Sequence, residues 1–249
     1  MDLVDREKLS AIAHRQHVYC NPFAPERIER IIELLRLAPD DRAVDFGCGK
    51  AELAIRLIER FGVTVVAIDR SPRMIAEAKR RAHGRINEDR LILHEADGSS
   101  FGGPARYALG ICVGATHVFG RYIDTLKHLM RIVHPGGHVL VGEAYWKRKP
   151  ERAYLEAMAA KAEDYAEHHE NVCAAEKLGL VPLHAAVSSE EEWDDYEWRY
   201  SRSVEQYAME NPTDPDLPAM LKHIRAWRKT YLKWGRDTLG FGLYLFHRP

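Results

Sequence analysis

The chain has 249 residues, 46% of them hydrophobic and 29% charged, which is enough to bury the core of one domain. Its formal net charge of −1 disfavours a nucleic-acid partner, because phosphate contacts require clustered positive charge. No run approaches the ~20 apolar residues that cross a bilayer, and the charged segment 2–8 is unlike a secretion signal. Four scattered cysteines without a C-x-x-C pair predict neither disulfides nor a zinc site, so we expect a cytoplasmic protein with no membrane partner.

Strand-like and helix-like segments alternate along most of the chain. Apolar residues at helical spacing predict helices over 25–37 and 121–133, and two more after Gly49 and after Ser71. Short apolar runs predict strands at 42–46, 64–68, 91–95, 108–113, 138–142, 180–187 and 242–246. Helices that connect parallel strands cover both faces of a sheet. The pattern therefore predicts an α/β fold with a doubly wound, mostly parallel seven-stranded sheet.

A long insertion, 189–236, separates the last two predicted strands. Ser189 and Glu192 form a capping-box pattern for a first helix, and Asn211-Pro212 separates it from a second. Trp and Tyr recur at helical spacing on both, which is typical of a mutual core. The insertion leaves the sheet at the edge where parallel strands end, so we expect a lid with one or two aromatics reaching the substrate. The expected organisation is a single domain, 1–249, with an N-terminal helical segment 1–38, an α/β core 39–188 and 237–249, and the lid 189–236.

Glycine-rich or acidic residues follow each of the first three predicted strands. Ligands of parallel sheets bind beyond these carboxyl ends. Gly47 and Gly49 allow the backbone to approach a ligand closely. Asp69 lies 20 residues beyond Gly49, a spacing suited to the ribose hydroxyls, and Asp97 is placed to accept from an adenine amine. The series predicts an adenosyl pocket, although Asp69 alone could be a helix cap and Asp97-Gly98 a plain turn.

The charges around the glycine turn distinguish between adenosyl ligands. A dinucleotide site has the pattern G-x-G-x-x-G, with the pyrophosphate at a helix N-terminus. Here Glu52 stands at the third glycine position, and Asp45 comes two residues before Gly47. Two carboxylates would repel a pyrophosphate and attract a sulfonium and an ammonium group. The residues therefore favour S-adenosylmethionine over NAD.

The segment Val44-Asp45-Phe46-Gly47-Cys48-Gly49, with Asp69, Asp97 and Pro135-Gly136-Gly137, resembles the motif series of class I S-adenosylmethionine-dependent methyltransferases over about residues 40–145. The resemblance implies that Asp45 and the two glycines line the methionine part, Asp69 the ribose, and Asp97 with Gly98 the adenine edge. The cofactor-binding set expected on this basis is Asp45, Gly47, Cys48, Gly49, Asp69, Arg70, Asp97, Gly98 and Val113. Ala51 departs from the glycine often found there. The rest of the chain is similar to a bacterial small-molecule subgroup without an established substrate.

Candidate catalytic residues follow the fourth and fifth predicted strands: His117, Glu143 and Tyr145. Methyl transfer is an in-line displacement, so positioning supplies most of the acceleration, and a base is needed only if the acceptor arrives protonated. The 13 histidines show no spacing typical of a metal site. His14, His17, Tyr19 and Asn21 lie in a segment that could fold over the cofactor.

We expect transfer to an oxygen, nitrogen or sulfur atom of a small-molecule acceptor. The fourth strand ends Val113-Gly114-Ala115-Thr116, without the Asx-Pro-Pro-Tyr motif that the family associates with methylation of base or glutamine nitrogens. The basic second lid helix would suit an RNA methyltransferase instead, although the acidic first helix could simply complement it. A non-catalytic S-adenosylmethionine-binding protein is a further alternative. The aromatic insertion could also serve a homodimer.

Overall fold

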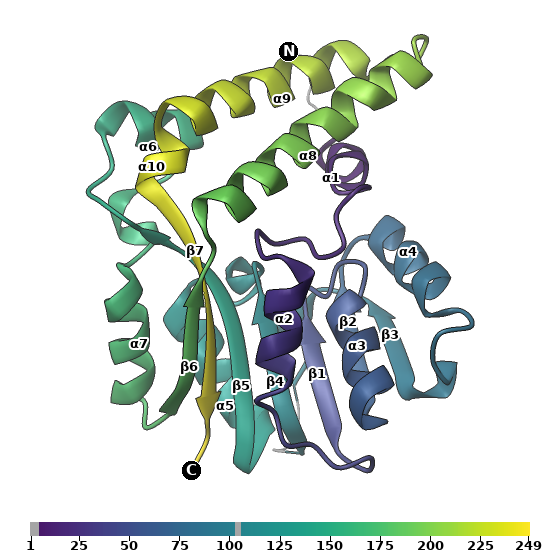
Figure 1. Ribbon diagram of the computed structural model, residues 1–249, viewed down its shortest axis with the longest axis vertical. Coiled ribbons are helices and arrows are strands. Elements are labelled where there is room, and N and C mark those ends of the chain that lie inside the picture. The colour runs from purple at the N-terminus through teal and green to yellow at the C-terminus, as the bar shows by residue number, and fades with distance from the viewer. Residues whose placement is uncertain (1–4, 103–105) are drawn as a thin grey trace.

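The computed structural model describes residues 5–102 and 106–249. Its central feature is a seven-stranded sheet in the order β3-β2-β1-β4-β5-β7-β6 (Figure 1). The strands are β1 (Arg42–Phe46), β2 (Thr64–Asp69), β3 (Leu91–Glu95), β4 (Tyr107–Val113), β5 (Val133–Trp146), β6 (Val181–Val187) and β7 (Leu239–His247). The first five pair in parallel, and β7 runs antiparallel between β5 and β6. The predicted mostly parallel, seven-stranded α/β fold is confirmed.

Helices cover both faces of this sheet. The helices of the described structure are α1 (Arg6–Ala13), α2 (Pro25–Ile32), α3 (Glu52–Phe61), α4 (Pro72–Ala82), α5 (Tyr122–Ile132), α6 (Arg152–Met158), α7 (His168–Lys177), α8 (Glu190–Glu210), α9 (Leu217–Thr230) and α10 (Arg236–Thr238). Helices α2, α3 and α4 pack on one face, and α5 and α7 on the other. Alternate side chains of a strand enter opposite cores, as Ala43 and Val44 of β1 do. This burial on two faces explains why β2, with the sequence TVVAID, is almost continuously apolar.

Helices α1, α8 and α9, here called the helical cap, lie across the edge of the sheet where the parallel strands end (Figure 1). They share a small core of their own, which includes Leu9, Val204 and Ile224. The predicted capping box is present at the start of α8. The backbone N–H of Ser189 donates to the Glu192 carboxylate at 2.7 Å, and the Glu192 N–H donates to the Ser189 hydroxyl at 3.1 Å. Tyr200, Tyr207 and Trp227 pack against the core of the cap, so part of each aromatic stripe holds the three helices together.

Several boundaries differ from the sequence-based expectation. Strand β5 is longer than the predicted 138–142, because pairing with β7 continues it to Trp146. Helix α2 ends at Ile32 and not at residue 37, because the chain turns there to enter β1. Helix α6 was not predicted. Among the described residues, the structure has no helix with both the length and the apolarity needed to span a membrane.

Candidate functional site

The turn between β1 and α3 brings the backbone itself to the edge of the sheet. Gly47 and Gly49 have φ values of +66° and +53°, a region that residues with a Cβ rarely adopt. A Cβ on Gly47 would lie 2.2 Å from the Cβ of Ala115, so a side chain is excluded there. Ala51, which replaces an expected glycine, also has a positive φ of +54°. That conformation costs roughly 1–2 kcal/mol for an L residue.

Asp69, at the end of β2, both fixes this turn and faces the ligand side. One carboxylate oxygen accepts a hydrogen bond of 2.8 Å from the Gly49 N–H, and the other accepts one of 2.9 Å from the Ser71 N–H. Each carboxylate oxygen has two lone pairs, so both keep capacity for further donors. The geometry fits the ribose-binding role expected of Asp69.

Asp45 places a buried carboxyl group beside the glycines. It is 4% exposed, and its carboxylate makes no hydrogen bond to any residue in the described ranges. Burial, followed by repulsion from Asp69, raises its pKa to about 8. A buried carboxylate without a partner is stabilised by a cation. Asp45 therefore fits the ammonium and sulfonium groups of S-adenosylmethionine.

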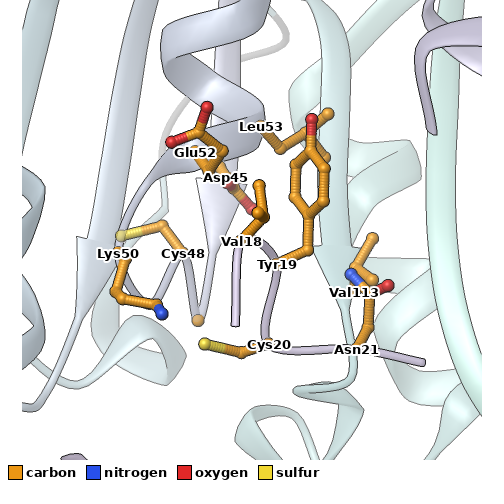
Figure 2. Close-up of a pocket in the computed structure, with 11 residues that line it drawn as sticks. Val18, Tyr19, Cys20, Asn21, Asp45, Cys48, Lys50, Glu52, Leu53 and Val113 are labelled. Carbon is orange, nitrogen blue, oxygen red and sulfur yellow. The ribbon is translucent and has the colours of Figure 1, made fainter. Parts of the chain in front are cut away.

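A cavity lies between the glycine turn and the N-terminal segment 18–21 (Figure 2). Its lining includes four members of the expected cofactor set, namely Asp45, Gly47, Cys48 and Val113. Burial raises the pKa of the Cys48 thiol well above its usual value, so this cysteine is a packing residue and not a nucleophile.

The remaining expected cofactor residues stand farther along the same edge. Asp97 is exposed, and its carboxylate accepts a 2.9 Å hydrogen bond from the Ser99 N–H, which lowers its pKa. Gly98 is buried beside Phe46, and Arg70 is exposed directly after Asp69. Because β2 and β3 are neighbours, these residues follow adjacent strand ends. They extend the site away from the cavity in the direction expected for the adenine.

Lys50 ties the N-terminal segment to the glycine turn, a function that the sequence analysis missed. Its Nζ donates to the carbonyl of His14 at 2.7 Å and to that of His17. Both imidazoles contact Tyr196 of α8: the Nε2 of His14 lies 3.0 Å from its hydroxyl, and the Nε2 of His17 lies 3.0 Å from its carbonyl. The segment that begins at His14 is therefore held between the cofactor turn and the helical cap.

A second cavity, here called the acceptor cavity, lies next to the first. Its lining includes Thr116, His117 and Glu143 from the ends of β4 and β5. The helical cap contributes the aromatic residues Trp193, Tyr196 and Trp227. Cys20 and Asn21 line both cavities, so the two are adjacent. Three cap aromatics thus line the cavity, and the expectation that one or two of them reach the substrate stays a prediction.

Glu143 is the most unusual group in the acceptor cavity. It is 8% exposed and accepts hydrogen bonds from the Thr116 hydroxyl and, at 2.9 Å, from the Ala144 N–H. Among the described residues it has no ion-pair partner, and burial raises its pKa to about 7. Such a carboxyl group can exchange a proton near neutral pH. Thr116, which orients it, carried no recognisable signal in the sequence.

The other two candidate catalytic residues differ in position. His117 lines the acceptor cavity and is exposed overall, but the protein around its ring removes part of its hydration; this desolvation, followed by the charge of Arg70, lowers its pKa. Tyr145 packs against Gly240 and the ring of His168, with ring centroids 5.3 Å apart. The structure therefore brings His117 and Glu143 together and places Tyr145 among packing residues.

One argument from the sequence needs correction. Glu52 does not face a ligand as an isolated charge, because it forms ion pairs of 3.2 Å with Arg81 and 3.0 Å with Arg85. These pairs neutralise it, so Glu52 contributes little to discrimination against a pyrophosphate. The electrostatic preference for a cationic ligand rests on Asp45.

The basic residues of the second lid helix are partly neutralised by the first. Arg225 and Arg228 both pair with Glu205 of α8, at 2.8 and 3.3 Å. Arg236 pairs with Asp194 at 3.0 Å. The two helices therefore present complementary charges to each other over much of their length.

Comparisons with known proteins agree with this geometry. The family model described as "Methyltransferase domain" matches residues 43–137. The uncharacterized protein YjhP of Escherichia coli is 26% identical over 243 residues, 97% of this chain and 98% of that protein. The 27-O-demethylrifamycin SV methyltransferase of Amycolatopsis mediterranei is 28% identical over 137 residues, 55% of this chain and 50% of that protein.

A crystal structure extends the similarity to the whole chain. A SAM-dependent methyltransferase from Geobacter sulfurreducens, in complex with S-adenosyl-L-homocysteine, superposes with a TM-score of 0.90 at 26% identity. The alignment covers 99% of this chain and 100% of that one. The glycine turn, the acids at the strand ends and these similarities agree on the cofactor. The chain is a class I S-adenosylmethionine-dependent methyltransferase.

Proposed function

We propose that the protein transfers the methyl group of S-adenosylmethionine to an oxygen, nitrogen or sulfur atom of a small molecule held in the acceptor cavity. The observation that carries this proposal is the adjacency of the two cavities through Cys20 and Asn21. S-adenosylmethionine supplies an activated methyl group on a sulfonium centre. The protein aligns the acceptor with that group and excludes water beneath the helical cap.

Two further observations support a small acceptor. The 27-O-demethylrifamycin SV methyltransferase, which is similar over half of its length, is named for a small-molecule acceptor. The ion pairs of Arg225 and Arg228 with Glu205 reduce the positive surface that an RNA substrate would require. We therefore favour a small acceptor over RNA.

The proposal is tested by following a labelled methyl group. The protein is incubated with methyl-labelled S-adenosylmethionine and either a small-metabolite extract or total RNA. We expect label in a small product, and none when Asp69→Ala removes cofactor binding. Label in RNA would contradict the proposal, and so would cofactor binding without transfer to any extract component.

A further inference from the structure

The Glu143 carboxyl group lines the acceptor cavity, and no cation among residues 5–102 and 106–249 pairs with it. Its oxygens accept from Thr116 and from its own neighbour Ala144, both uncharged donors. Arg121 also lines the cavity, but its side chain is exposed and lies 3.7 Å from the carboxylate of Asp124. Buried carboxylates are normally paired with a cation, or they take up a proton. A cationic ligand would supply the missing partner.

Aromatic rings surround the same cavity. Trp193 and Tyr196 come from α8, Trp227 from α9, and Tyr165 from the segment after β5. The Trp227 indole N–H donates a 2.6 Å hydrogen bond to Glu197, which fixes the orientation of its ring. Faces of aromatic rings attract ammonium groups, by about 0.5–2 kcal/mol each. A carboxylate below and rings around form a site for an organic cation.

We propose that the acceptor is an amine that binds as its ammonium ion between Glu143 and the aromatic rings of Trp193, Tyr196 and Trp227. This inference rests on the proposed function and specifies the substrate class. A phenol or a thiol would leave the buried carboxylate without a counter-charge, whereas an ammonium ion pairs with it. Asp164, a second acid of the cavity, adds to the negative potential.

Glu143 then also serves as the proton acceptor. The ammonium nitrogen gives one proton to the Glu143 carboxylate, which leaves a lone pair on the nitrogen. That lone pair forms the bond to the methyl carbon while the carbon–sulfur bond breaks, and its electrons remain on sulfur. The products are the methylated ammonium, S-adenosylhomocysteine and a protonated Glu143, which releases its proton to solvent. No further reactant is needed.

The test compares two probes that differ in one group, phenethylamine and 2-phenylethanol. Both are titrated into protein saturated with S-adenosylhomocysteine. In the wild type we expect the amine to bind roughly tenfold more tightly or better, because it alone pairs with Glu143. In Glu143→Gln the preference should fall severalfold, to the residual preference that the aromatic rings provide. The matched control is Glu163→Gln, because that acid is exposed, close in sequence to the cavity residue Asp164, and outside the cavity lining; the preference should be unchanged.

A second pair of variants tests the aromatic contribution independently of Glu143. Trp193→Leu removes the ring and should weaken amine binding severalfold without changing alcohol binding, whereas Trp193→Phe should retain most of the preference. Thermal melting of each variant shows whether it is folded.

Three outcomes would overturn the inference: no amine binding, equal binding of amine and alcohol by the wild type, or a preference that is undiminished in Glu143→Gln. Methyl transfer to an alcohol or thiol but not to amines would also overturn it, yet would leave the proposed function intact. If the wild type does not bind S-adenosylhomocysteine at all, the proposed function itself is contradicted.

Discussion

The backbone N–H of Gly49 donates a 2.8 Å hydrogen bond to the carboxylate of Asp69, across the ends of β1 and β2. The residue expected to hold the ribose thus also fixes the glycine turn that approaches the methionine part. Its other oxygen accepts from the Ser71 N–H at the start of α4. One carboxylate therefore couples the shape of the turn to recognition of the cofactor.

Removal of this carboxylate should weaken cofactor binding strongly. Asp69→Ala removes the charged acceptor of the two hydrogen bonds expected from the ribose hydroxyls. Each is worth about 1.5–3 kcal/mol, so affinity for S-adenosylhomocysteine should fall about a hundredfold or more. Asp69→Asn keeps an acceptor for the Gly49 N–H and should lose less affinity for S-adenosylhomocysteine. Calorimetric titration measures both, with the exposed Asp89→Ala as control. Affinity within twofold of wild type for Asp69→Ala would refute the ribose assignment.

Cofactor binding should release a proton from Asp45. Its pKa is raised to about 8, so the carboxyl group is largely protonated at pH 7 before binding. A bound ammonium group stabilises the ionised form and lowers this pKa, so affinity should rise between pH 6 and 8. Calorimetry in two buffers of different ionisation enthalpy gives the number of protons released, which we expect to vanish in Asp45→Asn. An equal number of protons from variant and wild type would exclude Asp45 as their source.

Glu143 should make stability depend on pH. Its folded-state pKa of about 7 lies above the ordinary glutamate value of 4.5, so its contribution is fully present below about pH 4.5 and is lost as the pH rises to about 7. At 1.36 kcal/mol per pKa unit, the loss is about 3 kcal/mol at most. Glu143→Gln lacks this titration, so its melting temperature should fall less than that of the wild type between pH 5 and 7.5. Parallel curves would show that Glu143 is already ionised in the folded protein.

Lys50 should keep the N-terminal segment conformationally ordered. Its Nζ donates to the carbonyls of His14 and His17, and Lys50→Met leaves both without this donor. We expect faster amide exchange over residues 14–21 and a severalfold weaker affinity for S-adenosylhomocysteine, because this segment closes the cofactor cavity. Hydrogen exchange with mass spectrometry measures the first effect. The exposed Lys79→Met is the control, and unchanged exchange in Lys50→Met would argue against the tether.

The fold could be predicted from local sequence patterns because the strands and turns of the parallel core have strong sequence signals. Buried strands such as β2 are largely apolar runs, and Gly47 and Gly49 mark the turn that leaves β1. Boundaries were less predictable where pairing partners are distant in sequence. Strand β5 reaches Trp146 because it pairs with β7, about a hundred residues later. Periodicity within one segment contains no information about such pairing.

The expected cofactor residues, and His117 and Glu143 of the acceptor cavity, could be named from the sequence for the same reason, whereas Thr116 and Lys50 could not. Asp45 and Asp69 stand at strand ends, so their position follows from the secondary structure. Thr116 and Lys50 act through contacts that depend on how separate elements meet. Tyr145 shares a strand with Glu143, but its ring meets Gly240 on β7, a contact that only tertiary structure reveals.

The most direct measurement is calorimetric titration of the wild-type protein with S-adenosylmethionine, S-adenosylhomocysteine and NAD at pH 8. The glycine turn and the buried Asp45 predict saturable binding of the two adenosyl sulfur compounds with one site per chain, and no measurable binding of NAD. Binding of NAD, or absence of binding by both sulfur compounds, would contradict the assignment of this strand edge as an S-adenosylmethionine site.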